Sequence, residues 1–136
     1  MIRQILLLLL LPVLPAVVLA VALPNAAESQ TTQLPDATHW TLPQVLAHEQ
    51  VLWIDARPAA EYEQDHIPGA MPLEMQDWDS QLPAVLETWS EEQLLVVYCS
   101  RSQCDASEAV AQRLRNEVGL PNVVTLLGGW EAWQNQ

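Results

Sequence analysis

The sequence contains no lysine, so arginine supplies all five basic residues against 17 acidic ones, and the formal net charge is −12 at pH 7. Nucleic acids and anionic lipid head groups are bound by clusters of basic side chains, which this chain does not have. We therefore exclude nucleic acid as a partner. Arg3 precedes a hydrophobic segment, so four arginines remain in the rest of the chain: Arg57, Arg101, Arg113 and Arg115.

Cysteine is also scarce, with only Cys99 and Cys104 in the chain. These two cysteines and the three scattered histidines show no spacing typical of metal ligands. We therefore predict no metal site, and nothing in the sequence calls for a cofactor.

Charge is absent from the N-terminal stretch between Ile5 and Leu23, which follows Arg3. We interpret residues 1–24 as a hydrophobic helix that is either a secretory signal peptide or a membrane anchor. The stretch is about long enough to span a bilayer, and Ala20-Val21-Ala22 suits cleavage, so both alternatives stay open. Either one predicts an exported protein, periplasmic or membrane-anchored through residues 5–23, with its domain outside the cytoplasm.

The remainder divides into a linker and one domain. Residues 25–37 are rich in Ala, Ser, Thr, Gln and Pro, which is typical of a linker. Residues 38–136 are enough for a single domain. Continuous apolar runs at 51–54, 94–98 and 123–126 predict strands buried on both faces.

Helical patterns separate these strands. Thr41 and Gln44 form a capping box, a short helix runs from Pro58 to about Gln64, and a further helix carries Leu82, Val85, Leu86 and Trp89 on one face. Asp105 and Glu108 are predicted to cap a helix that ends at Gly119, and a last short helix follows Gly128. Because strands alternate with helices, we predict a parallel sheet in a three-layer α/β sandwich.

Polar residues follow two of the predicted strands. Asp55 and Arg57 follow the strand at 51–54, and Cys99 follows the strand at 94–98. In parallel sheets the ligand site lies beyond the carboxyl ends of the strands. We therefore expect Asp55, Arg57 and Cys99 to lie together at one edge of the sheet.

Residues 99–104 form a polar loop between a strand and a helix, and Cys99 is its first residue. Backbone N–H groups of such a loop and the helix N-terminus converge on one sulfur, which lowers the pKa of the thiol and makes it nucleophilic. Arg101 adds positive charge at the mouth, where an anionic substrate would enter.

Four motifs, in order and at the right separations, resemble the rhodanese family of sulfurtransferases between Trp40 and Trp133. The resemblance implies a five-stranded parallel sheet and a cysteine that carries sulfane sulfur as a persulfide. It makes Cys99 the catalytic nucleophile, with Asp55, Arg57 and Glu61 in supporting, structural positions. The motifs are Ile54-Asp55-Ala56-Arg57 with Glu61-Tyr62, His66-Ile67-Pro68-Gly69-Ala70, Val97-Tyr98-Cys99 with its loop, and Leu127-Gly128-Gly129-Trp130 with Ala132-Trp133.

The resemblance also implies the active-site loop and the reaction. The loop consists of Ser100, Arg101, Ser102, Gln103 and Cys104. The reaction implied is transfer of sulfur from a donor of the thiosulfate or polysulfide type to a thiophilic acceptor. The implied partners are small sulfur-containing anions or thiols, and a protein sulfur acceptor or thiol reductant.

The loop departs from the common family pattern at two positions, with Ser102 in place of glycine and Cys104 in place of arginine. The Cys-x4-Cys-Asp spacing resembles an exported subset of the family. Three interpretations of Cys104 stay open: a disulfide partner of Cys99, a resolving thiol, or a small buried residue.

Two other functions also stay open, namely a thiol redox protein or sensor that cycles a Cys99–Cys104 disulfide, and a catalytically silent binding module. A phosphatase is rejected, because Asp105 would place negative charge against a phosphoryl dianion. His66 is predicted to be a turn residue rather than a base.

Overall fold

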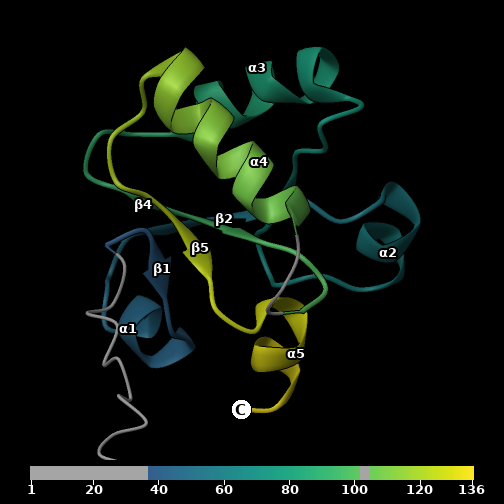
Figure 1. Ribbon diagram of the computed structural model, residues 1–136, viewed down its shortest axis with the longest axis vertical. Coiled ribbons are helices and arrows are strands. Elements are labelled where there is room, and N and C mark those ends of the chain that lie inside the picture. Colours follow the sequence, from purple (N-terminus) through teal and green to yellow (C-terminus); the bar gives the residue numbers. More distant parts are fainter. Residues whose placement is uncertain (1–36, 102–104) are drawn as a thin grey trace, which may run out of the picture. The chain divides into compact units, whose positions relative to one another are not determined.

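The computed structural model describes residues 37–101 and 105–136 (Figure 1). The predicted signal peptide or anchor helix, nearly all of the predicted linker, and Ser102, Gln103 and Cys104 lie outside the described residues. Within the described ranges, no helix combines the length and apolar character needed to cross a membrane.

The core of the fold is a five-stranded sheet in which every strand pair is parallel, in the order β1-β5-β4-β2-β3. The three strands predicted from apolar runs are all present, and all five residues of β4 are buried. The two edge strands are only two residues long, too short to leave a sequence pattern. The strands are β1 (His39–Trp40), β2 (Val51–Asp55), β3 (Met71–Pro72), β4 (Leu94–Tyr98) and β5 (Val123–Leu126).

Helices lie on both faces of the sheet, with α3 and α4 on one face and α1 and α5 on the other (Figure 1). The chain after α4 continues as a π-helical segment, Leu114–Val118, and Gly119 ends it in the left-handed conformation at φ 79°. Only glycine adopts that conformation readily, which confirms the predicted stop. The helices are α1 (Leu42–Leu46), α2 (Ala59–Gln64), α3 (Trp78–Thr88), α4 (Asp105–Arg113) and α5 (Gly129–Gln134).

Alternate residues of the central strands enter two separate cores. In β4, Leu95 and Val97 pack with α3 and α4, whereas Val96 and Tyr98 pack on the side of α1 and α5. This alternation explains why the strands are apolar throughout, because both faces of the sheet are covered. The three-layer α/β sandwich predicted from the sequence is therefore confirmed.

Helix starts were predicted with mixed success. The Thr41 N–H donates to Gln44 Oε1 at 2.8 Å, as a capping box requires. At α4 the prediction was wrong, because Asp105 is already helical and Glu108 does not reach back. Instead Glu108 Oε1 accepts a hydrogen bond from Arg115 at 2.9 Å, and its Oε2 lies 3.3 Å from His39 Nε2. Arg115 thus binds the carboxylate that the predicted capping box would need.

Candidate active site

The carboxyl ends of β2 and β4 lie side by side at one edge of the sheet. Asp55, the last residue of β2, is in register with Tyr98, the last residue of β4. The Ala56 N–H extends this pairing by donating to the Tyr98 carbonyl at 2.9 Å. Asp55 thus ends β2 and Cys99 directly follows the neighbouring strand β4, which confirms that the topology brings them to one edge.

Arg57 is held in a buried ion pair beside this edge. Its guanidinium donates to both Asp55 oxygens, at 3.0 Å from Nε and 2.7 Å from Nη2, and Arg57 and Asp55 are 3% and 0% exposed. Nη2 also donates to the Asp65 carbonyl at 2.6 Å. Burial alone would lower the pKa of Arg57, but the hydrogen bond and charge of Asp55 outweigh it and raise this pKa. Arg57 therefore stays positively charged, and Asp55 balances this charge. Its hydrogen bonds connect β2 with the segment after α2.

Tyr98, which directly precedes Cys99, belongs to the same hydrogen-bond network. The sequence did not predict that its hydroxyl contacts Asp55. Its hydroxyl donates to Asp55 Oδ2 at 2.7 Å and accepts from the Ile67 N–H at 3.2 Å. Burial raises the Tyr98 pKa well above its usual value, and the hydrogen bond and charge of Asp55 act in the same direction, against the opposing hydrogen bond from the Ile67 N–H. The hydroxyl remains protonated and fixes the end of β4.

Cys99 directly follows β4 and is only 2% exposed. The Ser107 hydroxyl donates to Cys99 Sγ at 3.4 Å, and the Arg101 carbonyl oxygen lies 3.4 Å from the same sulfur. Ser107 was also missed by the sequence analysis, although a signal exists. It sits at helical spacing with the buried residues Val110, Ala111 and Leu114, so a polar side chain faces inward from the first turn of α4.

Helix α5 packs its first turn against the Cys99 backbone. The Cys99 carbonyl accepts from the Trp130 N–H at 2.7 Å, and the Ser100 carbonyl accepts from the Glu131 N–H at 3.2 Å. Gly129 has φ 52°, and a Cβ at this position would overlap the Cys99 carbonyl oxygen. The glycine pair before Trp130 is thus needed so that α5 can begin in contact with the cysteine.

Glu61 connects the buried ion pair to the loop after β4. Its Oε2 accepts from Ser100 Oγ at 2.9 Å and lies 3.8 Å from Arg57 Nη1. Arg101 is exposed, and the predicted loop residues Ser102, Gln103 and Cys104 lie outside the described part of the chain. The structure therefore brings Asp55, Arg57 and Cys99 to one edge of the sheet, as the sequence predicted. It also places Glu61 in contact with Ser100 and Arg57 there.

A polar cavity of about 320 Å³ adjoins Glu61. The Trp130 ring forms one wall, and the Arg57 guanidinium lies 4.6 Å from the ring centroid. Side chains at the cavity combine hydrogen-bond donors with two carboxylates. The residues that line it are Arg57, Glu61, Gln64, Asp65, Trp130 and Gln134.

Residues 41–136 match the family model described as "Rhodanese-like domain". The chain belongs to the rhodanese-like family. This rhodanese-like chain is similar to thiosulfate sulfurtransferase GlpE of Coxiella burnetii, strain RSA 493 / Nine Mile phase I, with 31% identity over 91 residues. The matched region covers 67% of this chain and 78% of that protein.

Solved structures agree on the rhodanese-like fold. The BH2092 protein from Bacillus halodurans superimposes with a TM-score of 0.59 at 21% identity, covering 73% of this chain and 72% of that one. A rhodanese-like domain protein from Staphylococcus aureus gives a TM-score of 0.51 at 20% identity, covering 71% and 90%. At these identities the likeness establishes the fold alone.

Proposed function

We propose that the protein is a sulfurtransferase that moves sulfane sulfur from a donor to a thiophilic acceptor through a persulfide on Cys99. The single observation that carries the proposal is the placement of Cys99 Sγ. Cys99 follows a fully buried strand, and its sulfur accepts a hydrogen bond from the buried Ser107 hydroxyl. A donor aimed at a buried sulfur favours its anionic forms, the thiolate and the persulfide.

The reaction consists of two displacements. The Cys99 thiolate attacks the outer sulfur of a donor such as thiosulfate, the S–S bond of the donor breaks, and sulfite leaves with the electron pair. Cys99 now carries a persulfide anion. A nucleophilic acceptor such as cyanide or a thiolate attacks the outer sulfur, and the Cys99 thiolate leaves and is regenerated.

The surrounding residues hold the backbone on either side of Cys99 in place. Asp55, Arg57 and Tyr98 fix the ends of β2 and β4, and Glu61 holds the Ser100 hydroxyl. We assign Asp55, Arg57 and Glu61 supporting roles. Ser100, Arg101, Ser102, Gln103 and Cys104 form the proposed active-site loop, whose amides would stabilise the persulfide.

Donor, acceptor and location are part of the proposal. The relative named thiosulfate sulfurtransferase supports a donor of the thiosulfate type, and a polysulfide offers the same reactive sulfur. The acceptor is a small thiol or anion, or a protein thiol. The hydrophobic segment at 5–23 supports export, with residues 1–24 as signal peptide or anchor, 25–37 as linker and 38–136 as the domain.

The test is thiocyanate formation from thiosulfate and cyanide by the reduced protein. We expect turnover by the unaltered chain, none by Cys99→Ser, and retained turnover by the matched control Cys104→Ser. Because each variant loses one sulfur atom from the same region, a general effect of losing a thiol would appear in both. Turnover that persists in Cys99→Ser would contradict the proposal.

A second candidate is a thiol redox protein in which Cys99 and Cys104 cycle between dithiol and disulfide. It is favoured by the observation that the described part of the chain contains no free cysteine thiol. The same two variants separate the functions, because redox cycling needs both cysteines whereas sulfur transfer needs only Cys99. Equal loss of activity in the two variants would favour the redox function.

A further inference from the structure

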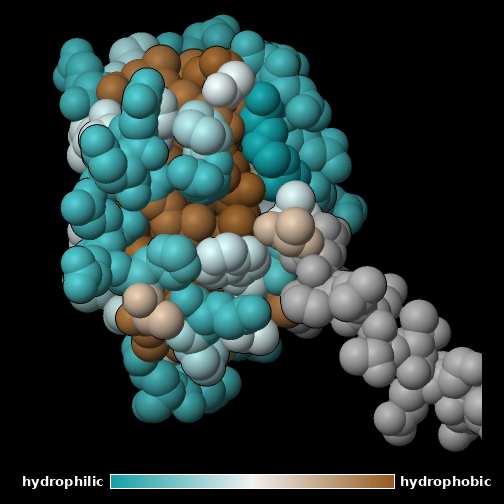
Figure 2. All heavy atoms as spheres, turned by 90° about the vertical axis from the view of Figure 1, so that its left-hand side faces the viewer, coloured by the Kyte–Doolittle hydropathy of each residue, from teal (hydrophilic) through white to brown (hydrophobic). Residues whose placement is uncertain are grey.

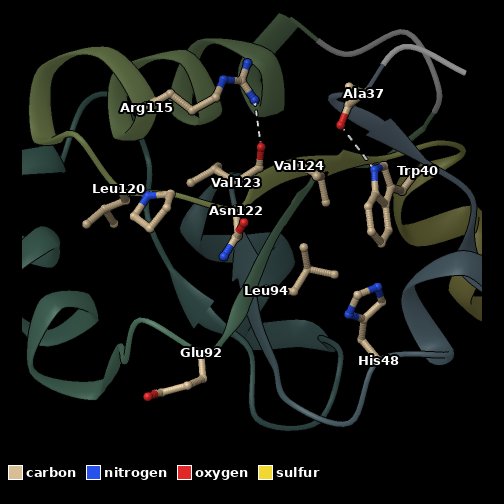
Figure 3. Close-up of a pocket in the computed structure, with 11 residues that line it drawn as sticks. Ala37, Trp40, His48, Glu92, Leu94, Arg115, Leu120, Asn122, Val123 and Val124 are labelled. Carbon is tan, nitrogen blue, oxygen red and sulfur yellow. Dashed lines mark hydrogen bonds between the residues drawn. The ribbon is translucent and has the colours of Figure 1, made fainter.

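Hollows lie at both ends of strand β4. The side of the molecule that carries β1 and α1 shows a band of hydrophobic side chains framed by hydrophilic ones (Figure 2). The larger hollow, of about 620 Å³, is lined by Leu94 at the start of β4 and has an apolar floor (Figure 3). The smaller is the polar cavity of about 320 Å³ beside Glu61. Because Cys99 follows the end of β4, a reactant of Cys99 would use this smaller, polar cavity.

Two residues that line the polar cavity also hold the backbone of the proposed active-site loop. The Trp130 N–H donates to the Cys99 carbonyl at 2.7 Å. Glu61 Oε2 accepts from Ser100 Oγ at 2.9 Å. A molecule in the cavity would thus contact the residues that hold Cys99 and Ser100.

The polar cavity carries an excess of negative charge. The charge of Arg57 is already balanced by Asp55 in the buried ion pair. The Glu61 side chain is 46% exposed, and Asp65 is exposed on the same cavity, so two further carboxylates stay without a basic residue of their own. Arg101 is not among the residues that line it. This balance favours a positively charged ligand and disfavours an anion.

One hydrogen-bond donor at the polar cavity is left over within the buried ion pair. Arg57 donates through Nε and Nη2 to Asp55 and to the Asp65 carbonyl. Its Nη1 lies 3.8 Å from Glu61 Oε2, too far for a hydrogen bond, and makes none with the other described residues. Arg57 is 3% exposed and lines the cavity, so a carbonyl oxygen placed there would satisfy this donor.

We propose that the sulfur acceptor is a cysteine-like aminothiol, with its ammonium group beside Glu61 and its carbonyl oxygen facing Arg57 Nη1. The acceptor thiol loses its proton to water and attacks the outer sulfur of the Cys99 persulfide. The S–S bond breaks, the Cys99 thiolate leaves with the electron pair, and the acceptor departs as a persulfide. The inference rests on the proposed sulfur transfer and narrows its acceptor. It makes Glu61 a residue that selects the acceptor by charge.

The test is discharge of the sulfur-loaded protein, followed by intact mass, in the Cys104→Ser background. Three thiols share one scaffold: cysteinamide, N-acetylcysteinamide and N-acetylcysteine. At about pH 6 they are positive, neutral and negative, respectively. The ratio of the cysteinamide rate to the N-acetylcysteine rate should fall about tenfold in Glu61→Gln, because attraction of the cation and repulsion of the anion are both weakened a few-fold. A mere change in loop geometry would alter all three rates together and leave this ratio unchanged.

Glu63→Gln is the matched control. It removes the same charge from an exposed residue of α2 that does not line the cavity. Its rate ratio should change less than about twofold, because water and salt screen a charge outside the cavity. An unchanged ratio in Glu61→Gln, or an equal fall in Glu63→Gln, would overturn the inference.

A second reaction examines the cavity without sulfur transfer. The unloaded Cys99 thiolate attacks the ethyl-bearing sulfur of aminoethyl or sulfonatoethyl methanethiosulfonate, and methanesulfinate leaves with the electron pair. The aminoethyl-to-sulfonatoethyl rate ratio should fall in Glu61→Gln and not in Glu63→Gln. If the protein takes up no sulfur while this ratio falls, the proposed sulfur transfer is wrong and Glu61 selects a different reactant of Cys99. If sulfur loads and neither ratio falls, the sulfur transfer stands and the aminothiol acceptor is wrong.

Discussion

Ser107 Oγ lies 3.4 Å from Cys99 Sγ, and both residues are almost completely buried. Cys99 follows strand β4, whereas Ser107 is in the first turn of helix α4. The hydrogen bond therefore joins the two elements that flank the proposed active-site loop. A buried hydroxyl stabilises an anionic sulfur more than an exposed hydroxyl does, because water does not compete for the hydrogen bond.

Ser107→Ala should slow formation of the persulfide, because the anionic sulfur of Cys99 loses a buried hydrogen-bond donor. Loss of one hydrogen bond to a charged group corresponds to a rate lower by about tenfold. The measurement is the rate of alkylation of Cys99 by iodoacetamide at neutral pH, in the Cys104→Ser background. Ser100→Ala is the control, because its hydroxyl donates to Glu61 and not to Sγ. Equal alkylation rates in Ser107→Ala and the control would contradict this role of Ser107.

Asp55→Asn should destabilise the fold strongly, because it leaves the Arg57 guanidinium buried without its charge partner. Breaking a buried ion pair costs about 3–5 kcal/mol, measured here as the free energy of unfolding in urea. Glu117→Gln is the matched control, because it removes the partner of Arg113 in an exposed pair, where about 0–1 kcal/mol is expected. Similar losses in the two variants would show that the Asp55–Arg57 pair does not hold the edge of the sheet.

Much of this arrangement could be predicted from the sequence. The fully apolar runs of β2, β4 and β5 made both the parallel sheet and the meeting of Asp55 with Cys99 predictable. The contacts of Tyr98 were not predictable in the same way, because they depend on which face of the strand meets Asp55. The inward direction of Ser107 could have been read from its helical spacing with Val110, but not its contact with Cys99. Tyr98 looked like one more apolar strand residue, and Ser107 looked like part of a helix cap.

At the start of α4 the sequence predicted a contact that the structure does not have. The local pattern of Asp105 and Glu108 favoured a capping box, but Arg115 and His39 offered Glu108 partners that the local pattern does not contain. Arg115 is seven residues further along the chain, and His39 comes from the edge strand. Tertiary contacts of this kind override a local capping preference.

Tyr98→Phe should reduce the loss of unfolding free energy at alkaline pH. The Tyr98 pKa is raised in the folded protein, so its contribution to stability is complete below about pH 10, the value of an unfolded tyrosine, and is lost as pH rises further. The unaltered protein should therefore lose unfolding free energy more steeply between about pH 9.5 and 11 than Tyr98→Phe does. Urea titrations across this range measure the difference.

Tyr62→Phe is the control for that experiment. The Tyr62 hydroxyl donates to the Ala70 carbonyl at 2.9 Å and not to a carboxylate. Its variant should keep the steep alkaline decline. Parallel declines in all three proteins would show that Tyr98 does not titrate later in the folded state than in the unfolded state.

Salt should raise kcat/KM for an anionic donor. The chain carries a net charge of −12, so thiosulfate is repelled as it approaches, and ions screen this repulsion beyond about 10 Å at 0.1 M. We expect a several-fold rise between about 0.01 and 0.2 M salt for thiosulfate, and almost no change for an uncharged organic trisulfide. Equal salt responses of the two donors would contradict electrostatic repulsion as the cause.

The most direct test of the central claim is the intact mass of the reduced protein after brief exposure to thiosulfate or polysulfide, followed by mapping of the modified peptide. The account predicts a gain of about 32 Da on Cys99, absent in Cys99→Ser and retained in Cys104→Ser. A loss of about 2 Da with no gain, or a gain that maps only to Cys104, would contradict a Cys99 persulfide.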